Sequence, residues 1–187
     1  MEKKDLKPAG VFKYFEEICQ VPRPSKKEEK MIAYLKAFGA KHNLETKVDE
    51  AGNVLIKKPA TPGKENLQTV VLQSHIDMVC EKNNDVQHDF LTDPIETEID
   101  GEWLKAKGTT LGADNGIGVA TELAILADDS IEHGPLECLF TVDEETGLTG
   151  AFALQEGFMS GDILLNLDSE DEGELFIGCA GGIDSVA

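Results

Sequence analysis

Residues 69–75 read TVVLQSH, a short run of Val and Leu that ends in a histidine. A continuous apolar run of this length is typical of a strand that is buried in a sheet. Two further runs have the same form, LECLFTV (136–142) and DILLNLD (162–168). Because helical segments alternate with these strands, the order of elements predicts an α/β fold with a mostly parallel central sheet and helices on both faces.

Helical periodicity marks the segments around these strands. The first predicted helix spans residues 8–21 and stops at Pro22 and Pro24, because proline breaks a helix. A second helix is expected to open at Ser25, with Glu28 three residues later in a capping box. Further helices are predicted at 117–128 and 147–157, and hairpins at 44–58 and 99–106, turning at 51–53 and 100–101.

Composition narrows the class of protein. The 187 residues are 41% hydrophobic, enough for one domain with a core. The formal net charge of -19 argues against nucleic acid and against an anionic membrane surface, because both attract basic proteins. The N-terminal residues lead into an amphipathic segment rather than a signal core, and no apolar run approaches membrane-spanning length, which favours a cytoplasmic protein. Reduced, buried thiols are expected at Cys19, Cys80, Cys138 and Cys179, none of which forms a CxxC pair.

Each apolar strand runs into a side chain that can bind metal. A glycine-rich turn, GTTLGADNG (108–116), contributes another, and its Gly108, Gly112 and Gly116 fit a backbone that bends closely around a ligand. In open α/β sheets ligands gather at the carboxyl ends of strands, so these side chains are expected in one crevice. They are His75, Asp114, Glu145 and Asp168, with Glu144 next to Glu145 and Asp77 two residues after His75.

Each residue also has a structural interpretation. A single histidine after a strand is more often structural, and Asp114 could cap the following helix. Glu144 and Glu145 could be a solvated strand end, and Asp168 opens an acidic run, 168–174, that could be plain surface. The joint placement at strand ends and at a glycine-rich turn favours the functional interpretation.

The residue types suggest a reaction. Histidine and carboxylate ligands without thiolates suit zinc, cobalt or manganese. The two oxygens of Asp114 could bridge two ions, which about 3.5–4 Å apart can clamp the attacking and departing oxygens of a hydrolysis. One glutamate of the 144–145 pair could hold metal while the other takes a proton from water. Asp77 could brace the His75 ring.

Several blocks resemble one known family, the co-catalytic zinc peptidases that include carboxypeptidase G, aminoacylase and tripeptide aminopeptidase. These blocks are SHIDMV (74–79), GADNGIG (112–118), TVDEETG (141–147) and LNLDSEDEGE (165–174). Within the family, the chain is most similar to the aminoacyl-histidine dipeptidases. That similarity is carried by HIDMVCEKN (75–83), HDFLTDPIE (88–96), DGEWLKAKGTTLGADNGIGVA (100–120), HGPLECLFTVDEETGLTGA (133–151) and GCAGGID (178–184).

The resemblance implies hydrolysis of dipeptides such as Xaa-His at a two-zinc site, with Co²⁺ or Mn²⁺ as alternatives. It assigns His75 and Asp168 to one zinc, Asp114 to both, Glu145 to the second, Glu144 as general base and later acid, and Asp77 as the residue that orients His75.

The resemblance also implies residues beyond this chain. In the family, a histidine far downstream completes the second metal site, after a lid or dimerisation domain. Neither His88 nor His133 is at a matching position, and His133 precedes a strand, at the wrong end for the site. We therefore expect residues 1–187 to be an inactive N-terminal portion of the catalytic domain, with the lid and the C-terminal portion absent and the full-length protein a homodimer. A deacylase or carboxypeptidase of the same family, or a non-catalytic metal-binding module, stays open as an alternative.

Overall fold

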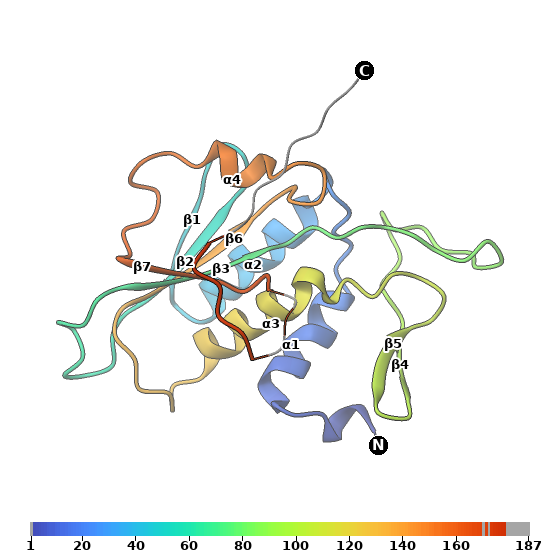
Figure 1. Ribbon diagram of the computed structural model, residues 1–187, viewed down its shortest axis with the longest axis horizontal. Helices are drawn as coiled ribbons and strands as arrows, with labels where there is room; N and C mark the ends of the chain where they lie inside the picture. Colours follow the sequence, from blue (N-terminus) through green and yellow to red (C-terminus); the bar gives the residue numbers. More distant parts are fainter. Residues whose placement is uncertain (1, 170, 172, 179–187) are drawn as a thin grey trace.

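The computed structural model describes residues 2–169, 171 and 173–178, and Figure 1 shows their arrangement. Within this part of the chain the main sheet has the strand order β1-β2-β6-β3-β7. Strand β3 pairs in parallel with β6 on one side and with β7 on the other, whereas β2 pairs antiparallel with both β6 and β1. The predicted mostly parallel sheet is confirmed, with an antiparallel hairpin at one edge. The strands are β1 (Glu45–Val48), β2 (Val54–Lys58), β3 (Val70–His75), β6 (Leu136–Thr141) and β7 (Ile163–Asn166).

Helices occupy the predicted segments. On α1, Phe15 and Ile18 lie one turn apart and are buried, and α1 packs against α3, which in turn packs against β3. The remaining elements are a short hairpin and two further helices, together with one turn of 3-10 helix. Their bounds are η1 (Lys3–Asp5), α1 (Ala9–Cys19), α2 (Glu29–Lys41), β4 (Thr97–Asp100), β5 (Trp103–Ala106), α3 (Ala113–Ala127) and α4 (Thr149–Ala153).

The two faces of the sheet are covered unequally. Helices α1, α2 and α3 contribute to one large core with sheet residues such as Ile56 and Phe140. On the opposite face, Leu55, Val71 and Leu139 pack against side chains from the segment 154–159 that follows α4. The large core therefore supports the strands from one side, and their carboxyl ends remain free to carry polar side chains.

Two local predictions were wrong. Strand β7 is not buried, because within the described residues it pairs only with β3; Ile163, Leu164 and Leu165 are 39–48% exposed. An apolar run alone does not distinguish an edge strand from a central one. The capping box at Ser25 does not form either, since α2 begins at Glu29 and the Ser25 hydroxyl donates to Asp77 instead (2.8 Å).

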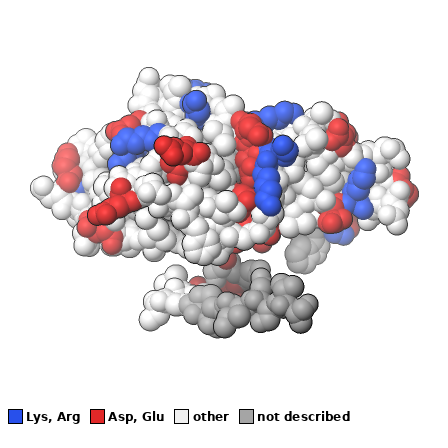
Figure 2. Space-filling view, turned by 90° about the horizontal axis from the view of Figure 1, so that it is seen from above, with Lys and Arg blue, Asp and Glu red and all other residues white. Residues whose placement is uncertain are grey.

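The prediction of buried thiols is confirmed for Cys19 and Cys138, whereas Cys80 is only half-buried. Cys19, Cys80 and Cys138 are free thiols, and burial raises the pKa of Cys19 to about 12, whereas Cys179 lies outside the described residues. Among the described helices, none is long and apolar enough to cross a membrane. Figure 2 shows acidic side chains spread over one face with basic ones between them.

One buried acid lies in the large core outside the predicted constellation. Glu122 on α3 is fully buried near Ser74 and Cys138, and its carboxyl oxygens have no partner with hydrogen-bond geometry among the described residues. Burial raises the pKa of Glu122 well above its usual range, so the folded protein keeps this carboxyl neutral.

We expect Glu122→Gln to stabilise the metal-free chain increasingly as the pH rises. Below the pKa that Glu122 has in the unfolded chain, the carboxyl is protonated in both states and the wild type keeps its full stability. Above that pKa the unfolded chain releases the proton while the folded chain, with its raised pKa, keeps it. The free energy of unfolding of the wild type therefore falls by up to about 1.4 kcal/mol per pH unit. Urea unfolding between about pH 5 and about pH 8 measures the difference. The exposed Glu156→Gln serves as the matched control, and parallel curves for Glu122→Gln and wild type would contradict the prediction.

Candidate metal centre

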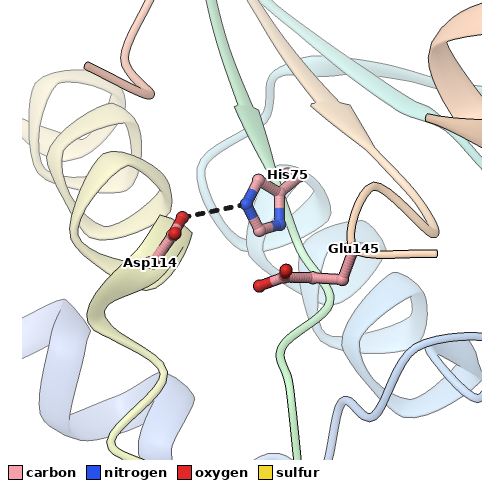
Figure 3. Close-up of side chains that lie close together, drawn as sticks. All are labelled: His75, Asp114 and Glu145. Carbon is pink, nitrogen blue, oxygen red and sulfur yellow. Dashed lines mark hydrogen bonds and ion pairs between the residues drawn. The ribbon is translucent and has the colours of Figure 1, made fainter. Parts of the chain in front are cut away.

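The predicted residues meet around the ring of His75. Its Nε2 lies 3.0 Å from Asp114 Oδ1 and 3.8 Å from both Glu144 Oε2 and Asp168 Oδ1. Figure 3 shows the side chains of Asp114 and Glu145 close to the ring of His75, with the contact between His75 and Asp114 drawn as a dashed line. The imidazole is 1% exposed and Asp114 is 62% exposed, so the histidine forms the floor of the site and carboxylates form its mouth.

The parallel strands explain this convergence. His75 ends β3 opposite Thr141 of β6, so the chain that leaves β6 brings Glu144 and Glu145 beside it. On the other side, Gln73 pairs with Asn166 of β7, and Asp168 follows two residues later. The carboxyl ends of adjacent parallel strands lie at one edge of the sheet, as the sequence analysis assumed.

Asp114 enters the site from the start of α3. Gly112 occupies the N-cap position with φ of +69°, and Asp114 and Asn115 have non-helical backbone angles. The peptide bond between Asp114 and Asn115 is cis. Since Asp114 makes no capping hydrogen bond and contacts His75, its interpretation as a helix cap is wrong.

Two sets of ligand atoms could each hold a cation. One set is His75, Asp114 and Glu145; the other is His75, Glu144 and Asp168, and within each set the atoms lie within 4.8 Å of one another. Nitrogen and carboxylate oxygen donors of this kind suit a divalent transition metal. The carboxyl groups of Asp114, Glu144 and Asp168 converge on His75 Nε2, and a divalent cation bound there would offset their mutual repulsion.

The carboxylates show this mutual repulsion. Burial, and then the charges of neighbouring carboxylates, raise the pKa of Glu144 and of Glu145, although His75 opposes the shift. Burial likewise raises the pKa of Asp168, against the hydrogen bond from Asn115 and the charge of His75. Burial lowers the pKa of His75, but the surrounding carboxylates outweigh it and raise that pKa to about 9.

Asp77 anchors the floor of the site and is fully buried. Its Oδ1 lies 3.2 Å from His75 Nδ1, and it accepts hydrogen bonds from the backbone amides of Glu144 (3.0 Å) and Glu145 (3.2 Å). Burial raises the pKa of Asp77, but these bonds and the one from Ser25 prevail and lower it to about 2. An ionised Asp77 therefore holds the imidazole with Nε2 directed at the carboxylates.

Sequence reasoning missed Asn115. Its side-chain amide donates to the Leu167 carbonyl (3.1 Å) and to Asp168, which ties the end of β7 to the start of α3. An amide is not a usual metal ligand, and only its position directly after Asp114 could have drawn attention to it.

Within the described part of the chain, the other acidic and histidine residues do not join the site. Glu28, Asp77 and Asp143 form a third, fully buried group, but their oxygens accept hydrogen bonds from backbone amides and hydroxyl groups. His133 lies before β6, at the opposite end of the sheet, with its carbonyl accepting from Thr61 (3.0 Å). The ring of His88 packs edge to face with that of Phe90, with the ring centroids 4.4 Å apart.

Open clefts flank Asp114. One, of about 320 Å³, is lined by Val79, Leu111 and Glu145; the other, of about 360 Å³, is lined by Ile117, Leu167 and Asp168. A larger cavity of about 510 Å³ lies between α1 and the end of α3, away from these polar groups. The two smaller clefts are the ones that lie beside the carboxyl groups of the candidate site.

Comparisons with known proteins show what the chain is similar to. Residues 71–181 match the family described as peptidase family M20/M25/M40. The chain is 54% identical to the cytosol non-specific dipeptidase of Escherichia coli K12 over 183 residues, which are 98% of this chain and 38% of that protein. A crystal structure of aminoacylhistidine dipeptidase from Vibrio alginolyticus superposes with a TM-score of 0.92 and 56% identity, covering 96% of this chain and 36% of that one. Aminopeptidase PepT from Bacillus cereus follows with a TM-score of 0.73 and 26% identity, over 87% of this chain and 43% of that one.

We expect the affinity of the chain for a divalent metal to rise with pH up to about 9. With its pKa raised to about 9, His75 carries a proton at neutral pH that a metal must displace. Each pH unit below that value should weaken binding roughly tenfold. Zn²⁺ calorimetry in buffers of different ionisation enthalpy measures both the affinity and the proton release. An affinity that stays constant from about pH 6.5 to about pH 9 would show that His75 does not bind the ion.

Proposed function

The chain belongs to peptidase family M20/M25/M40, and from this premise we propose that the protein hydrolyses dipeptides, Xaa-His among them, at a two-zinc site. The observation that carries the proposal is the approach of His75 Nε2 to oxygens of Asp114, Glu144 and Asp168 within 3.0–3.8 Å at the strand ends. The relatives named as a dipeptidase and as an aminoacylhistidine dipeptidase, both above 50% identity, support the substrate class.

The donor set supports zinc, with Co²⁺ or Mn²⁺ as alternatives. We assign His75 and Asp168 to one ion, Asp114 to both and Glu145 to the second. Bound divalent ions would polarise the scissile carbonyl and lower the pKa of a water molecule. Asp77 keeps Nδ1 of His75 engaged, so that Nε2 stays available at the floor of the site.

Glu144 is the proposed proton carrier. It is partly buried and lies 3.8 Å from His75 Nε2, and burial raises its pKa toward the range useful for proton transfer. Its carboxylate would take a proton from the attacking water and pass it to the departing amine. The backbone amide of Glu144 donates to Asp77, which holds the carboxylate close to the ligands.

The proposed activity is that of a longer protein. The chain spans 38% of the length of the E. coli relative. We propose that residues 1–187 form the N-terminal portion of the catalytic domain and that a downstream histidine completes the second metal site, so the isolated chain has little or no activity. The name of the E. coli relative supports a cytoplasmic location.

In the longer protein, we expect Glu144→Gln to lower turnover of Xaa-His dipeptides by about 10²–10⁴-fold with zinc content unchanged, because it removes a proton acceptor but no ligand. Glu145→Gln is the matched control and should lower zinc content. Turnover and zinc content are measured on the same preparations.

Three outcomes would count against this assignment. Loss of zinc in Glu144→Gln would make Glu144 a ligand. Turnover that survives in Glu144→Gln would remove it from the reaction. Exclusive turnover of N-acyl amino acids by the wild-type protein would favour a deacylase over a dipeptidase.

A further inference from the structure

A buried arginine connects the loop that follows His75 to the loop that precedes Asp114. Arg23 lies between α1 and α2 and is 3% exposed. Its Nη1 donates to the carbonyls of Ile76 and Asp77, both at 3.0 Å, and its Nη2 donates to the carbonyl of Gly112. The first two carbonyls directly follow His75, and the third stands two residues before Asp114.

Burial of this guanidinium calls for an explanation. None of the ion pairs among the described residues includes Arg23, and the partners of its side chain are neutral carbonyls. Taking a charge out of water is costly unless hydrogen bonds replace its hydration. The planar fork of arginine satisfies several carbonyls at once in a fixed geometry, which a lysine cannot reproduce.

Two glycines leave room for the guanidinium. A Cβ atom at Gly112 would lie 2.5 Å from Arg23 Nη2, and one at Gly116 would lie 2.7 Å from the same atom. At Gly108 a Cβ atom would instead meet Val86 at 2.5 Å. The space beside these three glycines is therefore filled by the protein's own side chains, whereas their part in bending the backbone around a ligand stays a prediction.

The backbone on either side of Arg23 strengthens this connection. The carbonyl of Arg23 accepts from the amide of Met78 (3.2 Å), and Pro24 and Met78 form a parallel bridge. Two residues on, the hydroxyl of Ser25 donates to Asp77. Residues 23–25 therefore run beside residues 76–78, and the guanidinium extends from this pairing to Gly112.

We propose that Arg23 is a positioning residue of the metal centre, which sets the distance between His75 and Asp114 by binding the carbonyls of both loops. This inference rests on the proposed metal-binding function. Arg23 touches no reacting atom in this account. It acts through Gly112, whose carbonyl would be left without this donor, and through Ile76 and Asp77.

A purely electrostatic role makes the opposite prediction. A positive charge near the site repels a cation, so Arg23→Met should strengthen metal binding if charge alone matters, and Arg23→Lys should change little. If position matters, both variants weaken binding, because neither reproduces the fork.

The test compares Arg23→Lys and Arg23→Met with Lys58→Met in the chain of 187 residues. Lys58 is a matched control, because it is 8% exposed and donates to the carbonyls of Ile125 (3.1 Å) and Asp128 (2.8 Å) at the opposite end of α3. We expect both Arg23 variants to lower Co²⁺ affinity about 10–100-fold and to alter the Co²⁺ absorption spectrum. Lys58→Met should lower the melting temperature and leave both metal readouts unchanged.

Hydrogen exchange of the metal-free chain gives a second readout. Exchange in the Arg23 variants should accelerate in 76–78 and 110–116 and stay unchanged in 54–58. Unchanged exchange in these loops, or Co²⁺ binding as tight as wild type in Arg23→Met, would overturn the proposal. If the wild-type chain binds no Co²⁺, the metal-binding function of this chain fails, and exchange alone still decides whether Arg23 joins the two loops.

Discussion

The buried carboxylate of Asp77 is the contact on which the candidate site depends. It lies against His75 Nδ1 and accepts from the amides of Glu144 and Glu145 and from the hydroxyl of Ser25. One side chain thereby joins the ends of β3 and β6 to the segment between α1 and α2. Because the pKa of Asp77 falls to about 2, the anchor stays charged at any pH at which the protein would work. The orientation of the imidazole follows from this fixed charge.

The carboxylates of the site lie close together and repel one another in the metal-free chain. Burial and neighbouring carboxylates raise the pKa of Glu144 and Glu145, and the pKa of His75 rises to about 9 as it pairs with the surrounding acids. A proton on His75 and a divalent cation are alternative ways to offset this repulsion. Metal binding and folding stability are therefore linked, since a cation that binds only the folded chain stabilises it.

The strands and the grouping of their carboxyl ends could be predicted from the sequence, because parallel strands bring their carboxyl ends to one edge of the sheet whatever lies between them in the chain. Sequence reasoning therefore located His75 and Asp168 correctly relative to each other without any knowledge of side-chain contacts. The contacts of Arg23 could not be predicted. Its partner Ile76 is 53 positions away, and a Pro-Arg-Pro segment contains no local pattern that indicates such a contact. The exposure of β7 was not predicted for a related reason. An apolar run indicates that a strand can be buried, but it does not indicate which element covers the strand.

Anomalous diffraction from crystals of the zinc-loaded chain would show whether His75 binds the ion. We expect an anomalous peak about 2.0–2.1 Å from His75 Nε2, with an oxygen of Asp114 also in the coordination sphere. A zinc ion bound instead beside Glu28 and Asp143, with His75 still paired only to carboxylates, would contradict this expectation.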